Sequence, residues 1–316
     1  MARKSLKQLI QESNEAIFAP CVYDCASARA MEMVGFKAMM FSSGELSLGM
    51  NGLIDYGFTS LPELEWAVSR ICDVSHIPLA VDIEDGFGGP LSVYRTVKRI
   101  ARAGAAAVQL EDSCSMQSAT ELLPREDYYA KVRAALKALE GTDCILIART
   151  NADPKTQMDE GIERCNEALK LGAHMTTIVR ITTREEAQLV SSRVPGWKMF
   201  PDVRAEGGKP AITLEECYKL GFPFVTTHFA LKAAMDGMLE HGRENLKNGD
   251  VSYTWQKKGA TGIYGFSATP LWNPKRWTKL ESEFTGVEKE YTIVGNKPDD
   301  LPEEYAKVLA QYDEEA

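Results

Sequence analysis

The feature that most constrains the fold of this chain is a regular alternation of short strand-like runs with helical patterns between residues 16 and 239. The runs are rich in β-branched and aromatic residues, and each following segment repeats apolar residues at helical spacing. The eight strand–helix units cover residues 17–22 with 26–34, 38–41 with 61–74, 79–81 with 91–103, 107–110 with 125–139, 144–147 with 158–171, 175–179 with 184–192, 198–200 with 214–220, and 224–226 with 230–241. Eight such units predict an α/β fold in the form of a closed (β/α)8 barrel of the TIM type.

Glycines mark the ends of four of the predicted helices. Gly35, Gly104, Gly172 and Gly221 each follow a helical pattern by about one residue, as expected for left-handed C-terminal caps. The alternative architecture is a doubly wound open sheet, which usually carries a glycine-rich turn after its first strand. Residues 22–26 read VYDCA and contain no glycine, so we favour the barrel.

The segments at the two ends extend this barrel. We expect one domain at residues 1–240, which includes an N-terminal helix with Leu6, Leu9 and Ile10 on one face, and a C-terminal helical extension at residues 241–316. The extension contains one clear amphipathic helix, whose apolar face carries Leu301, Tyr305, Val308, Leu309 and Tyr312. Apolar decoration outside a complete barrel predicts packing against a neighbouring subunit.

The composition of the chain indicates which kinds of partner it can bind and in which cellular compartment it is expected. The formal net charge of −9 and the pI near 5.2 provide no basic face for nucleic acid. No apolar stretch approaches the length of a signal sequence or a membrane span, so we expect a cytoplasmic protein without a membrane partner. The seven cysteines include no C-x-x-C pair, and we expect reduced thiols, mostly buried as small apolar residues.

The third predicted strand runs directly into a cluster of acids. Residues 78–89 read PLAVDIEDGFGG, which places Asp82, Glu84 and Asp85 between a buried strand and a glycine turn. Removing neighbouring carboxylates from bulk water is costly unless a cation or shared protons compensate their charge. Oxygen ligands without a nearby His or Cys favour Mg2+ or Mn2+ over Zn2+. The alternative is a solvated acidic turn before a helix N-terminus.

Nearly every predicted strand ends in a polar or charged residue, and in a barrel of this type such residues lie together on one rim. In chain order they are Tyr23, Asp24, Ser42, Ser43, Gly44, Glu45, Asp55, Asp82, Glu84, Asp85, Glu111, Asp112, Arg149, Thr150, Asn151, Arg180, Asp202, Arg204, Thr227 and His228. Acids dominate the first half of this series of rim residues, and cations are concentrated in the second half. This division suits a small polyanion, because acids can hold a metal ion while the ion and Arg149 bind carboxylates. We therefore expect a dicarboxylate or an oxo acid as the substrate.

Several short motifs on this rim resemble those of one known family. They are Y-D-x-x-S-A-R at 23–29, S-G at 43–44, D-x-G at 55–57, V-D-x-E-x-G-F-G at 81–88, A-G-A at 103–105, L-E-D at 110–112 and A-R-T-N-A at 148–152. In this order and spacing, over residues 22–238, the chain resembles the isocitrate lyase and phosphoenolpyruvate mutase superfamily. The resemblance implies a Mg2+-dependent enzyme that forms or consumes a pyruvate enolate, whose charge the metal ion and Arg149 stabilise.

The resemblance also implies a metal site formed by four carboxylates, those of Asp55, Asp82, Glu84 and Glu111. Glu84 stands where the family usually has aspartate. The extra methylene keeps the charge but moves the carboxylate outward, so direct and water-mediated ligation both stay open. The expected cofactor is Mg2+, with Mn2+ as an alternative.

Other rim residues are expected to bind the substrate or to move protons. The substrate-binding candidates are Ser43, Gly44, Glu45, Asp82, Asn151, Arg149 and Arg180. The catalytic candidates are Arg149, Glu111, Tyr23 and His228. Protonation of the enolate is expected to need only water or a general acid such as Tyr23 or His228.

Departures from the lyase pattern indicate which branch of this superfamily the chain resembles. The loop at 113–124 lacks the Lys-x-Cys-Gly-His sequence whose thiol is the acid in the family's methylisocitrate and isocitrate lyases. Its Cys114 is too near Asp112 to occupy the place of that motif, but it could still act as an acid if the loop folds over the site. Arg180 stands where the lyases have a glutamate. Together with His228 after the eighth strand, these features favour an oxaloacetate decarboxylase-like carbon–carbon lyase acting on a small 2-oxo or 2-hydroxy dicarboxylate.

Other functions stay open. A substituted-malate lyase of the 2,3-dimethylmalate or 2-methylisocitrate type would use the same enolate. Phosphonopyruvate P–C bond chemistry and a non-catalytic dicarboxylate-binding barrel are further alternatives. Because the family's barrels often exchange a helix between subunits, we expect a homotetramer with C-terminal helix exchange.

Overall fold

The structure, a computed structural model, describes residues 5–113, 121–257, 259, 261–262, 269–289 and 301–313. The chain divides into two compact units, Ala2–Leu231 and Lys232–Ala316. The first unit holds the barrel and the candidate site. The predicted domain boundary between residues 240 and 241 falls inside the last barrel helix, α10 (Ala230–Asn248).

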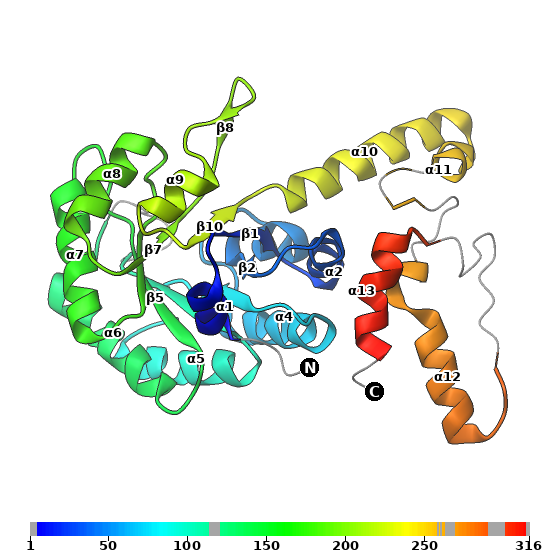
Figure 1. Ribbon diagram of the computed structural model, residues 1–316, viewed down its shortest axis with the longest axis horizontal. Coiled ribbons are helices and arrows are strands. Elements are labelled where there is room, and N and C mark those ends of the chain that lie inside the picture. The colour runs from blue at the N-terminus through cyan, green and yellow to red at the C-terminus, as the bar shows by residue number, and fades with distance from the viewer. Residues whose placement is uncertain are drawn as a thin grey trace. The chain divides into compact units, whose positions relative to one another are not determined.

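Eight parallel strands close into a barrel in the order β1-β10-β7-β6-β5-β4-β3-β2. Their bounds are β1 (Ile17–Val22), β2 (Met39–Phe41), β3 (Leu79–Asp82), β4 (Ala107–Glu111), β5 (Ile145–Thr150), β6 (Met175–Ile178), β7 (Trp197–Phe200) and β10 (Phe224–Thr227). Figure 1 shows the strands surrounded by the helices of the first unit. The closed parallel order confirms the predicted (β/α)8 fold of the TIM type.

Seven of the eight helices that follow the strands begin and end within one residue of the predicted bounds, whereas α10 continues seven residues beyond the predicted end at His241. The helices are α2 (Cys25–Val34), α4 (Leu61–Val74), α5 (Pro90–Arg102), α6 (Arg125–Leu139), α7 (Met158–Leu171), α8 (Arg184–Arg193), α9 (Leu214–Lys219) and α10. Each was expected from an apolar stripe that packs on the strands, and in α4 this stripe is Leu64, Val68 and Ile71, all fully buried. The predicted glycine caps are also present, since Gly35 and Gly172 take left-handed φ angles of +100° and +112° after α2 and α7.

A short N-terminal helix, α1 (Leu6–Glu12), closes the amino end of the barrel. Its buried Leu6 and Ile10 pack with inward-facing residues at the beginnings of strands, such as Phe224. Ser5 caps the helix through a capping box. Because this end is filled by apolar side chains, polar chemistry is left to the carboxyl ends of the strands.

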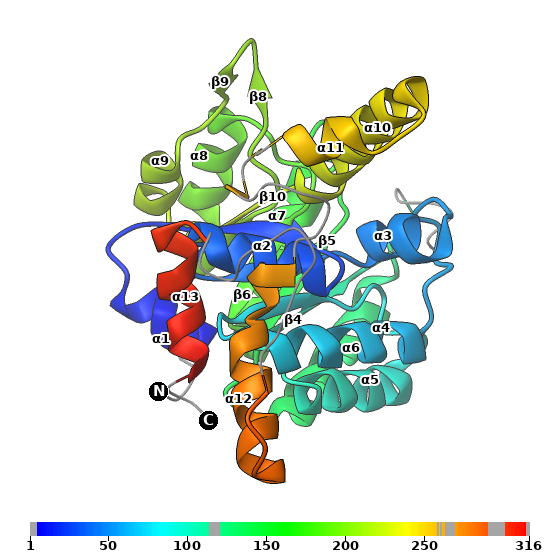
Figure 2. The ribbon, with the colours of Figure 1, turned by 90° about the vertical axis from the view of Figure 1, so that its right-hand side faces the viewer.

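The sequence patterns do not predict several short elements. β2 leads into the short helix α3 (Ser43–Leu46) and the π-helix η1 (Ser47–Asn51). β7 is followed by a two-stranded hairpin of β8 (Ala205–Glu206) and β9 (Lys209–Pro210), which projects from the barrel beyond α8 and α9 (Figure 2). Elements of two to five residues are too short to show a hydrophobic period.

The second unit is helical in its described part. Beyond α10 it contains α11 (Ser252–Gln256), η2 (Thr269–Trp272), α12 (Pro274–Thr285) and α13 (Glu303–Asp313). The predicted amphipathic helix near the C-terminus corresponds to α13, where Leu309 is buried. None of the helices in the described ranges combines the length and the apolar composition needed to cross a membrane. Cys21, Cys25, Cys144, Cys165 and Cys217 are free thiols, as expected, whereas Cys114 lies outside the described residues.

Candidate active site

The acidic turn after β3 divides its carboxylates between the barrel rim and an outer helix. Oδ1 of Asp82 accepts a hydrogen bond from the backbone N–H of Glu84 at 3.0 Å. Glu84 adopts a left-handed φ of +55°, and its side chain is buried. Asp85 instead forms an ion pair with Lys131 of α6 at 3.0 Å. The turn therefore presents Asp82 and Glu84 to the site, while Asp85 fastens the turn to α6.

Arg149, near the end of β5, links three other predicted site residues. Its Nη1 lies 2.8 Å from Oδ2 of Asp82, and its Nη2 lies 2.8 Å from Oε2 of Glu111. Its Nε donates to Oδ1 of Asn151 at 3.0 Å, and Nδ2 of Asn151 donates to Oε2 of Glu111 at 3.1 Å. The parallel register makes this possible, because Glu111 and Arg149 are direct neighbours across β4 and β5. The guanidinium group therefore lies within the acidic cluster.

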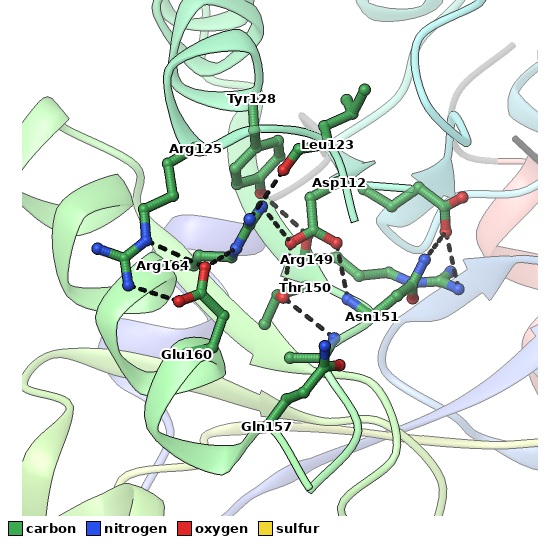
Figure 3. Close-up of polar contacts among 12 residues, drawn as sticks. Asp112, Leu123, Arg125, Tyr128, Arg149, Thr150, Asn151, Gln157, Glu160 and Arg164 are labelled. Atoms are coloured by element: carbon green, nitrogen blue, oxygen red, sulfur yellow. Dashed lines mark hydrogen bonds and ion pairs between the residues drawn. The ribbon is translucent and has the colours of Figure 1, made fainter. Parts of the chain in front are cut away.

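A second layer of buried polar groups lies behind this guanidinium (Figure 3). Asp112 is fully buried and accepts hydrogen bonds from the Thr150 hydroxyl at 2.6 Å and from the backbone N–H of Asn151 at 2.8 Å. Arg164 of α7 pairs with Asp112 at 3.1 Å and with Glu160 at 2.7 Å. This network ties the end of β5 to α7 and so fixes the residues that follow Arg149.

Burial raises the pKa of three of the four carboxyls predicted to bind a metal ion. Burial and the charge of Glu111 raise the pKa of Asp82 to about 6, although Arg149 acts in the opposite direction. Burial, with the charges of Asp82 and Glu111, raises the pKa of Glu84 well above its usual range, and burial also raises the pKa of Asp55. The cluster therefore carries more buried negative charge than one guanidinium neutralises.

The turn after β2 contacts two of these acids. An added Cβ at Gly44 would lie 2.6 Å from Oδ2 of Asp55, so only glycine leaves room for that carboxylate. Ser43 is buried, and its hydroxyl acts to lower the pKa of Glu84, against the larger effect of burial. The structure thus brings the predicted Ser43–Gly44 turn to the predicted metal-binding acids.

A cavity of about 180 Å³ lies at this end of the barrel. Its walls are formed by Cys21, Met40, Ser42, Gly44, Asp55, Asp82, Gln109, Arg149, Val179, Met199, Pro201, Thr226 and His228. Pockets for drug-sized ligands typically measure about 300–1,000 Å³. The cavity is therefore sized for a ligand of few heavy atoms, and its charged lining suits a carboxylate.

His228 follows β10 and contacts two side chains, Cys21 of β1 and Glu45 of α3. Its Nδ1 lies 3.2 Å from Oε1 of Glu45, and its Nε2 lies 3.4 Å from Sγ of Cys21. Burial alone would lower the pKa of His228, but the hydrogen bond and charge of Glu45, with smaller effects of Asp202 and Asp82, raise it above its ordinary value of 6.5. His228 can therefore carry a proton at the cavity wall near neutral pH.

Seven predicted site residues are not among the described residues that line this cavity, namely Tyr23, Ser43, Glu45, Glu84, Glu111, Asn151 and Arg180. The Tyr23 ring packs near Gly49 of η1, where an added Cβ would lie 3.1 Å from it, and Tyr23 is not among the described residues that line the cavity. Arg180 lines a second cavity of about 440 Å³, which shares Val179 with the first. The other residues of the second cavity are Asp153, Pro154, Lys155, Thr182, Glu186 and Arg204.

Similarity to known proteins identifies the family. Residues 6–246 match the model of the phosphoenolpyruvate phosphomutase family. The chain belongs to this family. A 2-methylisocitrate lyase from Aeropyrum pernix is 32% identical over 239 residues, which cover 72% of this chain and 76% of that protein.

Two further similarities concern oxaloacetate. An oxaloacetate decarboxylase from Rhodopseudomonas palustris is 30% identical over 194 residues, covering 60% of this chain and 67% of that protein. A solved structure of oxaloacetate acetylhydrolase in complex with its product oxalate matches with a TM-score of 0.78 and 26% identity, covering 90% of this chain and 97% of that one. Membership of the phosphoenolpyruvate phosphomutase family confirms the predicted superfamily, whose lyases and mutases act on small carboxylates.

The donor set of this family member has the chemistry that Mg2+ or Mn2+ prefers. All four candidate ligands are carboxylates, and three of them have a raised pKa because their buried charge is incompletely compensated. Within the described ranges, however, no three His, Cys, Asp or Glu side chains are arranged to hold an ion. Arg149 pairs with Asp82 and Glu111, so an ion would compete with this guanidinium for two of its ligands.

Sequence patterns do not single out two polar residues of the cavity. Cys21 is expected only as a small buried residue, and Gln109 lies within the buried strand β4. Oε1 of Gln109 has no hydrogen-bond partner among the described residues. An amide in the middle of an apolar strand is the one pattern that could have pointed to Gln109, because a buried polar group needs a partner.

Proposed function

We propose that this chain is a Mg2+-dependent carbon–carbon lyase that acts on a small 2-oxo or 2-hydroxy dicarboxylate through a pyruvate enolate, with oxaloacetate decarboxylation as its reaction. The observation that carries this proposal is the position of Arg149, whose guanidinium lies at the wall of a small cavity between Asp82 and Glu111. A guanidinium fork binds carboxylates in two-point fashion. Similarity to an oxaloacetate decarboxylase and to oxaloacetate acetylhydrolase supports the choice of substrate.

In this proposal, residues of the chain orient the substrate for loss of carbon dioxide. Arg149 binds the C1 carboxylate, and Ser43 and the backbone at Gly44 supply further hydrogen-bond donors. When bound by Asp55, Asp82, Glu84 and Glu111, Mg2+ would polarise the 2-oxo group and the adjacent carboxylate. Arg149 also lies where negative charge develops on the enolate oxygen, which lowers the barrier to cleavage. The geometry favours His228 over Tyr23 as the source of the proton, since His228 lines the cavity.

The test is pyruvate release from oxaloacetate, coupled to lactate dehydrogenase, with Mg2+ and with a chelator. We expect metal-dependent turnover that is lost in Asp82→Ala and retained in Asp159→Ala, whose carboxylate is exposed. Oxaloacetate loss is followed separately by its own absorbance. Absence of metal-dependent turnover in the wild-type protein would overturn the proposal.

A substituted-malate lyase is the second candidate, and the second cavity favours it. Arg180, Lys155 and Arg204 line about 440 Å³ next to the first cavity, so a longer substrate could extend across Val179 toward these cations. Similarity to a 2-methylisocitrate lyase supports this alternative. Metal-dependent pyruvate release from 2,3-dimethylmalate or 2-methylisocitrate, faster than from oxaloacetate, would select it.

We also propose that the protein is a cytoplasmic homotetramer in which the C-terminal helix packs on a neighbouring subunit. Free cysteines suit a reducing compartment. In the second unit, Leu246 and Phe284 are more than 80% exposed, and Trp277 is 61% exposed, as expected for helices that lack a partner. Sedimentation at micromolar concentration tests this assembly, and a monomer would contradict it.

A further inference from the structure

Cys21, His228 and Glu45 form a continuous row of side chains that links the barrel interior with solvent. Cys21 of β1 is only 1% exposed, yet it lines the same cavity as Arg149 and His228. The His228 side chain is 46% exposed. Because its Nε2 lies 3.4 Å from Sγ of Cys21, the imidazole ring connects bulk water with a thiol inside the cavity.

Glu45 determines how the ring is protonated. Glu45 is only 8% exposed, and its Oε1 lies 3.2 Å from Nδ1 of His228. Its other oxygen, Oε2, is buried and has no hydrogen-bond partner among the described residues, so the contact with His228 is the one that stabilises this buried carboxylate. A carboxylate in this place keeps a proton on Nδ1. A second proton, on Nε2, would then point at Sγ of Cys21.

The thiol keeps its own proton in this environment. Burial, with the charges of Glu45, Asp202 and Asp82, raises the pKa of Cys21 well above its ordinary range. A nucleophilic cysteine requires the opposite, a lowered pKa. A neutral thiol whose sulfur accepts a hydrogen bond from an imidazolium is instead arranged to donate its S–H proton into the cavity.

We propose that Cys21 is the proton donor to the pyruvate enolate and that His228, held by Glu45, returns a proton to it from solvent. This inference rests on the proposed function. It assigns to a strand-β1 thiol the acid role for which the loop at 113–124 lacks the lyase motif. It also places Tyr23, which does not line the cavity, outside the proton path.

The step balances in atoms and charge. The S–H bond of Cys21 breaks as the enolate carbon forms a C–H bond and the enolate oxygen becomes the carbonyl oxygen of pyruvate. The thiolate then takes the proton from Nε2 of His228, which leaves a neutral imidazole with its other proton on Nδ1. Water at the exposed face of the ring restores the imidazolium. One solvent proton is consumed for each pyruvate, and no oxidant or reductant is needed.

The test is exchange of the C3 protons of pyruvate with D2O, followed by 1H NMR with the Mg2+-loaded protein. Exchange of the C3 protons requires that a proton is removed from pyruvate and then returned to the enolate, and it involves no C–C cleavage. We expect Cys21→Ala to slow exchange by about 100-fold or more, as for loss of a general acid, and Cys21→Ser to be intermediate. The matched control is Cys25→Ala, four residues further along the chain and not among the described cavity residues.

Two further measurements separate proton transfer from packing. The Kd of oxalate, a planar dianion of enolate shape, should stay within about threefold of the wild-type value in Cys21→Ala. Exchange by Cys21→Ala/His228→Gln should be no slower than by Cys21→Ala alone, because both residues handle the same proton.

The outcomes distinguish this inference from the proposed function. A wild-type protein that neither releases nor exchanges pyruvate overturns both. Wild-type exchange that persists in Cys21→Ala overturns the inference alone. Loss of oxalate binding together with exchange in both Cys21 variants would make Cys21 a packing residue and would also overturn it.

Discussion

At the scale of single residues, Arg149 is the group on which the site depends. Its guanidinium contacts Asp82 of β3, Glu111 of β4, and Asn151, which directly follows its own strand β5. These three neighbours fix the plane of the guanidinium. A planar fork held in this way can present the same face to each incoming carboxylate. This one side chain therefore balances part of the acidic charge of the site, and in the proposed function it also binds the substrate.

Arg149→Lys should lower kcat/KM for pyruvate release by about 100-fold, because an ammonium group cannot make two parallel hydrogen bonds to a carboxylate. Steady-state kinetics at saturating Mg2+ measures this. The matched control is Arg193→Lys, whose partner Asp159 is an exposed surface residue and which should retain its activity. Near wild-type kinetics in Arg149→Lys would argue against the carboxylate clamp.

The pH dependence of turnover should report His228. Glu45 raises the pKa of His228, so activity that needs the imidazolium persists below this raised pKa and is lost as pH rises through it. Glu45→Gln removes the charge, and the falling limb of kcat should move to lower pH. In His228→Gln this limb should disappear. A limb that is unchanged in both variants would show that another group titrates.

At the scale of elements, the end of β5 is fixed by α7 through buried charges. Asp112 has no exposed surface, and burial raises its pKa despite hydrogen bonds from Thr150 and Asn151 and the charge of Arg164. Glu160, which holds Arg164, is held in turn by Arg125 at the surface. The position of the end of β5, which carries Arg149, thus depends on a charge network that spans two helices (Figure 3).

Arg164→Met should destabilise the protein by about 3–5 kcal/mol, because it leaves Asp112 buried without a cation. Urea unfolding measures the change. Arg125→Met, at the 49%-exposed end of the network, should cost about 1 kcal/mol or less. Arg164→Met/Asp112→Asn should recover part of the loss, and equal destabilisation by the single and double variants would refute this account.

The turn at α3 sets the distance between Gly44 and Asp55. Gly44→Ala would place Cβ 2.6 Å from Oδ2 of Asp55, so this carboxylate must move. We expect at least about a tenfold increase in the Mg2+ concentration needed for half-maximal activity. Gly237→Ala, where an added Cβ has no neighbour within 4 Å, is the control. Unchanged metal dependence in Gly44→Ala would remove Asp55 from the metal site.

At the scale of the whole molecule, the buried acids couple folding to pH and, in the proposed function, also to divalent cations. Asp82, Glu84 and Asp55 all have a raised pKa, so the folded state binds protons that the unfolded chain releases. Stability from this source is fully present below the unfolded pKa and is lost as pH rises through the folded one. A cation that binds the ionised carboxylates should restore it.

For Asp82, whose pKa is about 6, the window runs from about pH 4 to about pH 6. Without divalent cations, the difference in unfolding free energy between wild type and Asp82→Asn should fall by about 2–3 kcal/mol across this window. At pH 7.5, Mg2+ should raise the unfolding temperature of the wild type but not of Asp82→Asn. Asp159→Asn should respond as the wild type, and a pH-independent difference for Asp82→Asn would contradict the shifted pKa.

The sequence by itself determined the barrel and the rim. Helices such as 61–74 and 125–139 were predictable to the residue, because their apolar stripes must face the strands, and polar residues at strand ends had to gather at one end of the barrel. Only the tertiary structure decided which atoms meet. Arg149 reaches Asp82, 67 positions earlier, through strand register, and Cys21 reaches His228, 207 positions later, through barrel closure between β1 and β10. Such contacts depend on register and on the inward direction of each side chain, neither of which a local pattern specifies.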